Sequence, residues 1–169
     1  MTAIDVRAGQ APLEEGETAM SELKPPRSRE EMDLSIYGDS HVRLYQETKG
    51  EEGYIWNDAP ILLLTTKGRK SGQMRTTPLI FVANGGAPAI VASNGGAAEH
   101  PSWYQNIEAD PNIQVQVKGD IFDAVARTAD DAERERLWPE AVKAWPQYAD
   151  YQRSTDRKIP IVILDRKKA

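Results

Sequence analysis

The sequence predicts a mainly β fold with peripheral helices: a small closed or split β-barrel of six strands in mostly antiparallel order. Short apolar runs alternate with turn residues, and two pairs of runs are joined by the tight turns Asn84-Gly85-Gly86 and Lys118-Gly119-Asp120. Helical patterns occur only before the first strand, after the third and before the last, so strands and helices do not alternate as in a parallel βαβ sheet. The 169 residues, 40% of them hydrophobic, suit one core.

The first part of this domain predicts one helix and three strands. Residues 32–48 place apolar side chains at partly helical spacing, and the Lys-Gly-Glu-Glu-Gly run at 49–53 ends that helix. Residues 61–66 form a short apolar run, and residues 76–83 are rich in β-branched and aromatic side chains, so both predict strands. Residues 89–93 predict a third strand, antiparallel to the second.

The second part predicts a hairpin between two helical regions and a last strand. A short helix is expected over 102–108, and residues 113–117 alternate strictly before they turn into a partner strand at 121–127. Another helix begins after residue 128, with Thr128 as its cap and acidic residues in its first turn. Pro139 and Pro146 are expected to divide this helix into short pieces, and residues 159–164 form the last strand.

Composition excludes several classes of function. The chain has 21 Lys and Arg against 26 Asp and Glu, a net charge of −5, which argues against binding to nucleic acid. It has no cysteine and two isolated histidines, so thiol chemistry and a protein-bound metal are not expected, nor is a Ser-His-Asp triad. No long apolar run or leader-like N-terminus is visible, which predicts a cytoplasmic protein.

The N-terminal region differs in composition from the rest of the chain. Residues 1–33 hold eight acids and four bases, and they contain few aromatic side chains. Such a segment buries too little apolar area to offset its ordering entropy. We therefore expect a mobile acidic tail over residues 1–31 and a single folded domain over residues 32–169. Contact of the tail with a membrane surface is left open.

The most informative charge pattern is a stretch of forty residues between Asp58 and Glu99 that contains no acid. Four cations fall within residues 67–75 of that stretch, together with two glycines and Ser71. Glycines let the backbone turn sharply, and the cations and the hydroxyl supply donors, so the segment predicts a cradle for a phosphate or another small anion. It lacks the residue order of a Walker A loop. The alternative is a solvated basic hairpin loop.

Two aromatic features predict a site for a flat ligand. The glycine-rich residues 93–98 could admit a ring close to the backbone, with Trp103 as a wall, although Trp103 could equally anchor the short helix in the core. Trp145, Tyr148 and Tyr151 fall three residues apart, a spacing that places their rings on one helical face. They predict an aromatic wall that carries hydroxyl groups, with core packing as the alternative.

These segments resemble the deazaflavin-dependent nitroreductase family of actinobacteria. The similarity covers residues 35–165 and lies in separate blocks at 63–72, 75–79, 91–96, 101–106, 110–111 and 148–160. It implies a six-stranded antiparallel split β-barrel, related to flavin-mononucleotide and pyridoxamine-phosphate oxidase barrels. It also implies that the protein binds coenzyme F420 and takes a hydride from its reduced form.

The resemblance also implies roles for individual residues. The expected contacts to the phosphate and acidic tail of F420 are Arg69, Lys70, Ser71 and Arg75. The residues expected to bind the rest of the cofactor are Thr76, Thr77, Pro78, Leu79, Ile80, Val91, Ala92, Ser93, Asn94, Ser102, Trp103 and Asn106. Tyr148, Tyr151 and Ser93 are the expected catalytic residues, and Trp145 joins the two tyrosines in the substrate site.

The expected activity is hydride transfer from reduced F420 to a small conjugated acceptor, such as an enone, a quinone or a nitro compound. The nitroimidazole-activating member of the family has tyrosines at the positions of Trp145 and Ile80, so enones and quinones are the favoured acceptors here. One alternative is a carrier or store of F420, or of another anionic cofactor, without turnover. Another is a related barrel oxidoreductase that uses flavin mononucleotide. The protein is expected to be a monomer or a homodimer.

Overall fold

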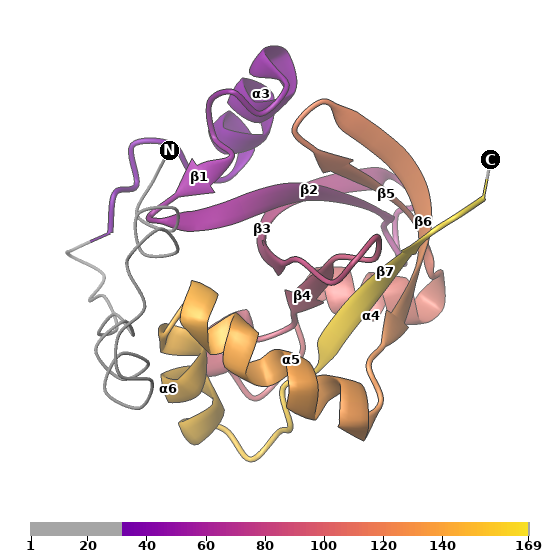
Figure 1. Cartoon of the computed structure of the whole chain (residues 1–169). Helices are drawn as coiled ribbons and strands as arrows, with labels where there is room; N and C mark the ends of the chain where they lie inside the picture. Colours follow the sequence, from indigo (N-terminus) through magenta and orange to yellow (C-terminus); the bar gives the residue numbers. More distant parts are fainter. Residues whose placement is uncertain (1–31, 169) are drawn as a thin grey trace.

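The structure is a computed structural model that describes residues 32–168 (Figure 1). The expected acidic tail at 1–31, with its membrane contact, lies outside the described residues. Along the chain the elements are α3 (Asp39–Thr48), β1 (Ile55–Trp56), β2 (Ala59–Lys67), β3 (Met74–Val82), β4 (Ala89–Val91), the 3₁₀ turn η2 (Asn94–Gly96), α4 (Ser102–Ala109), β5 (Asn112–Val117), β6 (Asp120–Thr128), α5 (Asp131–Ala144), α6 (Gln147–Arg153) and β7 (Ile161–Arg166).

The strands form a closed antiparallel barrel, which confirms the predicted fold class. The sheet order is β1-β2-β3-β4-β7-β6-β5, and pairing of β2 with β5 closes it. Six strands make the barrel, whereas β1 is an extra strand paired only with β2. Two residues are too short for a periodic pattern, which is why the sequence did not predict β1. The first helix is also shorter than expected, because residues 32–38 precede it without joining it.

The continuous apolar runs of β2 and β7 arise because both faces of these strands are buried. Leu62 and Leu64 of β2 belong to the core inside the barrel, whereas Ile61 and Leu63 pack with Val42 and Tyr45 of α3 on the outside. In β7, residues 162 and 164 lie inside, and residues 161 and 163 pack against α5 and α6. Side chains that alternate between two buried faces leave no polar position in the run.

The barrel opens along one edge of β3. This strand pairs with β2 from Met74 to Ile80, but it pairs with β4 only through Phe81 and Val82. Within the described residues, the rest of that edge has no strand partner. Proline is tolerated in a strand where its missing N–H faces no neighbour, which accounts for Pro78 in the middle of β3. Residues 77–80 along this edge line a cavity.

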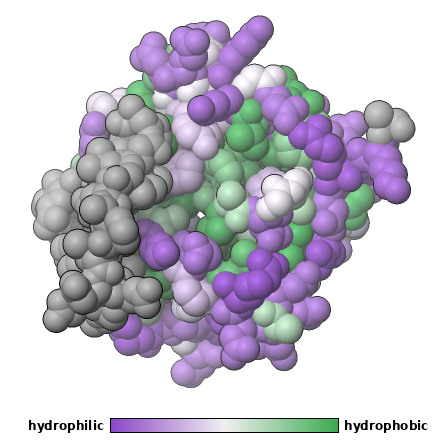
Figure 2. All heavy atoms as spheres, viewed as in Figure 1, coloured by the Kyte–Doolittle hydropathy of each residue, from purple (hydrophilic) through white to green (hydrophobic). Residues whose placement is uncertain are grey.

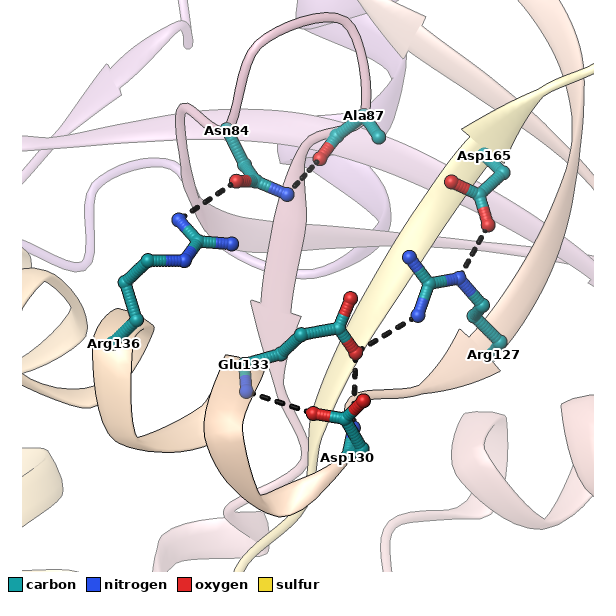
Figure 3. Close-up of polar contacts among 7 residues, drawn as sticks. All are labelled: Asn84, Ala87, Arg127, Asp130, Glu133, Arg136 and Asp165. Carbon is teal, nitrogen blue, oxygen red and sulfur yellow. Dashed lines mark hydrogen bonds and ion pairs between the residues drawn. The ribbon is translucent and has the colours of Figure 1, made fainter.

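The start of α5 is fixed to the barrel by a polar network (Figure 3). Asp130 caps the helix by accepting from the Glu133 N–H at 2.8 Å, and the Glu133 carboxylate accepts from the Asp130 N–H at 3.0 Å. Arg127 of β6 donates to Glu133 at 2.9 Å and to Asp165 of β7 at 2.6 Å, and its bond holds the pKa of Glu133 below its usual value. The prediction of Thr128 as the cap is wrong, because Thr128 ends β6 and its hydroxyl is bonded to Tyr104.

Helix α5 runs through Pro139, so the expected break at this residue is also wrong. A proline inside a helix removes one N–H donor, and here Leu137 and Ala141 on either side are buried against the sheet and hold the helix in place. The chain leaves the helix at Trp145, whose backbone is extended (φ −146°, ψ 91°), and Pro146 starts α6. The helical region is therefore divided once, at the second proline.

Candidate active site

A cavity of about 620 Å³ lies along the open edge of β3. The space-filling view shows one face of the molecule, on which hydrophobic residues gather toward the middle and hydrophilic residues border them (Figure 2). Residues of β3, the β4–η2 segment, α4 and the α5–α6 turn line the cavity: Thr77, Pro78, Leu79, Ile80, Val91, Ser93, Asn94, Gly95, Trp103, Trp145, Gln147, Tyr148 and Tyr151. Its aromatic and apolar lining suits a flat, conjugated molecule.

The hydroxyl groups of Ser93, Tyr148 and Tyr151 line this cavity and have no hydrogen-bond partner among residues 32–168, and the same is true of the Tyr37 and Thr77 hydroxyls. Tyr148 is only 5% exposed, and its ring contacts that of Tyr151 with the centroids 6.2 Å apart. Burial raises the pKa of Tyr148 above its ordinary value, so the phenol stays protonated at neutral pH. A buried hydroxyl without a partner lowers the stability of the fold. This hydroxyl can therefore donate a hydrogen bond to a bound ligand.

Trp145 also lines the cavity, but it does not share a helical face with the two tyrosines. It lies in the turn between α5 and α6, where its ring stacks on that of Trp56 with a centroid separation of 5.8 Å. The indole N–H of Trp56 donates to the Ile36 carbonyl at 3.0 Å, which fixes this wall. The spacing of the three aromatics therefore predicted correctly that they line one cavity, but it predicted wrongly that one helical face carries all three.

Several cavity residues were missed by the sequence analysis. Trp56 comes from the short β1, and His41 of α3 is buried with its Nε2 at 2.7 Å from the Gly53 carbonyl oxygen. Neither residue lies in a recognisable motif, and no spacing relates them to the other cavity residues. The remaining missed residues are Met32, Leu34, Tyr37, Gly38, Ile61, Pro101 and Gln147.

A second cavity of about 450 Å³ holds the predicted anion cradle. Its lining includes Arg69, Lys70, Ser71 and Arg75, and neither cavity has an Asp or Glu among its lining residues. The two cavities share Thr77 and Trp103 and therefore adjoin. Together they can take a ligand that is planar at one end and negatively charged at the other.

The cations of the cradle differ in how they are held. Arg69 donates from Nη1 to Asn106 Oδ1 at 2.8 Å and to Ser102 Oγ at 3.1 Å, and Asn106 in turn donates to Thr66 Oγ1 at 3.1 Å. Helix α4 therefore orients this guanidinium. The side chains of Lys70 and Arg75 make no hydrogen bond or ion pair with other residues of the described part of the chain. Their charge is left for a ligand.

Two of the residues expected at the cofactor line neither cavity. The Thr76 hydroxyl is hydrogen-bonded at 2.8 Å to the hydroxyl of Thr65, its cross-strand partner in β2. Ala92 is fully buried in the barrel core.

The two glycines of the glycine-rich turn have different roles. Gly95 lines the cavity, whereas a Cβ on Gly96 would lie 2.9 Å from the Tyr151 carbonyl oxygen. The missing side chain of Gly96 lets the turn pack against α6.

The sequence is similar to proteins with a named activity. A family model described as F420H(2)-dependent quinone reductase matches residues 39–166. The F420H(2)-dependent quinone reductase Rv1261c of Mycobacterium tuberculosis strain H37Rv is 36% identical over 149 residues, which are 80% of this chain and all of that protein. A putative F420H(2)-dependent quinone reductase of the same strain, Rv3178, is 38% identical over 62% of this chain and 88% of its own.

Solved structures agree with these relatives. A structure titled F420-H2 Dependent Reductase (FDR-A) is 48% identical, covers 63% of this chain and 94% of its own, and has a TM-score of 0.59. A structure described as a domain-swapped dimer is 42% identical, covers 73% of this chain and 96% of its own, and has a TM-score of 0.61.

None of the helices within residues 32–168 has the length and apolar character needed to cross a lipid bilayer.

Proposed function

Since this chain belongs to the F420H(2)-dependent quinone reductase family and is an F420H2-dependent oxidoreductase, we propose that it reduces a quinone bound in the larger cavity beside Tyr148. The observation that carries this assignment is the unpartnered hydroxyl of Tyr148, buried in a cavity that adjoins the cation cradle. A carrier or store would have no need of a buried donor at the acceptor side.

The residues present fit F420, whose phosphate and glutamate groups are anionic. Lys70 and Arg75, which have no partner among residues 32–168, would hold these groups together with Arg69 and Ser71. Residues 77–80 of β3, with Ser93 and Asn94, would line the deazaflavin in the adjoining cavity. The reduced cofactor, when bound, supplies a hydride, and the protein orients both reactants and excludes water.

Tyr148 has the main chemical role among the chain's own residues. Hydride transfer to a quinone develops negative charge on a carbonyl oxygen, and a fixed donor at that position stabilises the transition state. Because burial raises its pKa, Tyr148 keeps its proton and donates throughout the neutral range. Tyr151 and Ser93 are the nearby hydroxyls that can complete the set of donors.

Anaerobic mixing of the protein and reduced F420 with a water-soluble naphthoquinone tests the proposal. Oxidation of the cofactor, followed by its absorbance, should be rapid with the quinone and slow without the protein. Reduced flavin mononucleotide in place of F420 tests the alternative cofactor, and a cyclic enone tests the other acceptor class. Tight F420 binding without accelerated oxidation by any quinone would contradict the proposal and favour a carrier.

A further inference from the structure

One arginine outside the two cavities makes an unusually large set of contacts with the loop that carries Ser93. Arg157, in the connection between α6 and β7, donates from Nη1 to the Ala92 carbonyl at 3.1 Å and from Nη2 to the Ser93 carbonyl at 2.8 Å. Its Nε and Nη2 reach the Ala97 carbonyl at 3.2 and 3.0 Å. Its Nη1 also lies 2.9 Å from Nδ1 of His100. A single guanidinium thus spans the loop from residue 92 to residue 100.

The other hydrogen bonds of this loop are mostly local. Gly96 N–H donates to Ser93 O at 2.9 Å and Ala97 N–H to Asn94 O at 3.1 Å. Asn94 Nδ2 donates to the Glu99 carbonyl at 3.0 Å, and Gln105 Nε2 donates to the His100 carbonyl at 3.0 Å. Gly95 and Gly96 have φ values of 64° and 84°, a region that glycine enters easily in the unfolded chain as well. Three carbonyl groups that point to one side have Arg157 as their shared donor. The guanidinium therefore holds the loop in one shape.

The same loop determines where Ser93 lies relative to the two tyrosines. Gly96 packs against the backbone of Tyr151 in α6, and Ser93 lines the same cavity as Tyr148 and Tyr151 of that helix. We propose that Arg157 is a positioning residue, which fixes the Ser93–Ala97 loop against α6 so that Ser93, Tyr148 and Tyr151 face one acceptor. In this role it depends on the proposed function, because the residues that it positions are those assigned to the acceptor.

His100 completes the clamp in its neutral form. A guanidinium has no acceptor, so Nδ1 of His100 must carry a lone pair and accept from Arg157. The titratable groups around this imidazole are Arg157 itself, Tyr104 of α4 with a ring separation of 4.6 Å, and the exposed chain neighbour Glu99. A proton on Nδ1 would remove the bond and place two cations side by side.

Amide hydrogen exchange on the cofactor-free protein tests the clamp directly. In Arg157→Gln, the amides of Gly96 and Ala97 should exchange about tenfold faster or more at neutral pH, a loss of protection that reports easier loop opening. Arg153→Gln, which removes an exposed arginine of α6 whose ion-pair partner within residues 32–168 is Asp150, should leave both amides unchanged. Unchanged exchange in Arg157→Gln would overturn the proposal. If that variant does not fold, Arg157→Lys provides the same comparison with a cation that cannot reach all three carbonyls.

Kinetics separate a positioning role from a purely structural one. Arg157→Gln should lower kcat for quinone reduction by about tenfold or more and leave KM for reduced F420 within about threefold, because the cations that hold the anionic end of F420 are untouched. His100→Gln, whose amide oxygen can still accept from Arg157, should keep the exchange of Gly96 and Ala97 close to that of the wild type. An unchanged kcat in Arg157→Gln would contradict the clamp. Wild-type protein inactive with every quinone would instead contradict the proposed function, and the exchange results would still decide the clamp.

Discussion

Tyr148 and Tyr104 are both buried tyrosines, but only the hydroxyl of Tyr104 has a partner. Tyr104 is bonded to Thr128 at 2.8 Å, whereas Tyr148 contacts no acceptor within residues 32–168. A buried hydroxyl without a partner destabilises the fold by about 1–3 kcal/mol. The protein therefore tolerates a hydroxyl at Tyr148 that lowers its stability. Such a cost is typical of a residue with a chemical role.

Tyr148→Phe should slow turnover without weakening the fold. We expect single-turnover oxidation of bound reduced F420 by a quinone to fall by about tenfold or more, because one transition-state hydrogen bond of at least about 1.4 kcal/mol is lost. Cofactor affinity and melting temperature should not decrease. The matched control is Tyr104→Phe, which should lose about 1 kcal/mol of stability and keep its turnover rate. A Tyr148→Phe enzyme as fast as wild type would assign the donor role to Tyr151, Ser93 or water.

The cradle predicts a different effect at Lys70 and Arg75. Replacing both by Ala should weaken F420 binding by about 1.5–3 kcal/mol per charge-assisted bond, because each is a cation without a partner in the described part of the chain. Fluorescence titration measures this affinity. Lys67→Ala is the control, since Lys67 is a cation of the same segment that lines neither cavity. Equal affinity of the double variant and wild type would show that the cradle binds something else.

Residues that are close along the chain were predictable, and residues brought together by folding were not. The cations of 67–75 could be recognised because they share one short segment. Trp56 is separated from its stacking partner Trp145 by most of the domain, and Arg157 lies 64 residues beyond Ser93 in the loop that it holds. No local spacing encodes such contacts, because the closure of the barrel creates them.

The elements show the same division between local and tertiary causes. The strands were predictable because alternation and apolar runs follow directly from burial on one or both faces. Pro139 misled the prediction because a proline weakens a helix locally, while burial of Leu137 and Ala141 on the barrel keeps it intact. The aromatic spacing at 145, 148 and 151 assumed one continuous helix, and the chain instead turns at Trp145.

The contact between η2 and α6 depends on Gly96. Gly96→Ala should destabilise the protein by more than about 2 kcal/mol, because its Cβ would clash with Ser154 and with the Tyr151 carbonyl and its φ is 84°. Gly95 has a φ of 64°, but nothing lies within 4 Å of a Cβ added there. Gly95→Ala should therefore lose only about 1–2 kcal/mol of stability, the cost of an alanine in the left-handed backbone region. Urea unfolding of the two variants measures the difference. Equal losses would show that the loop can move away from α6.

At the scale of the whole molecule, two buried phenols make the fold sensitive to alkali. Burial raises the pKa of Tyr148, and it raises the pKa of Tyr45 to about 12. The unfolded chain releases these protons near pH 10 while the folded protein retains them, so stability should fall as the pH rises above about 10, by about 1.4 kcal/mol per pH unit for each phenol. Below that pH neither group contributes to the pH dependence.

Urea unfolding between about pH 8 and about pH 11.5 measures this slope. Tyr148→Phe is the informative variant, because it removes one titrating phenol and no hydrogen bond made within the described residues. Its stability should decline less steeply than that of the wild type at alkaline pH. Parallel curves for the two proteins would show that Tyr148 ionises as easily in the folded state as in the unfolded chain.

The gap in the barrel also leaves a strand edge open to other chains. From Met74 to Ile80, β3 has a free edge within the described residues, and free edges invite strands of neighbouring molecules to pair and aggregate. Pro78 stands in the middle of that stretch and has no N–H to offer. A foreign strand would find its ladder of hydrogen bonds interrupted at this position. The residue that borders the ligand cavity therefore also interrupts strand pairing at this edge.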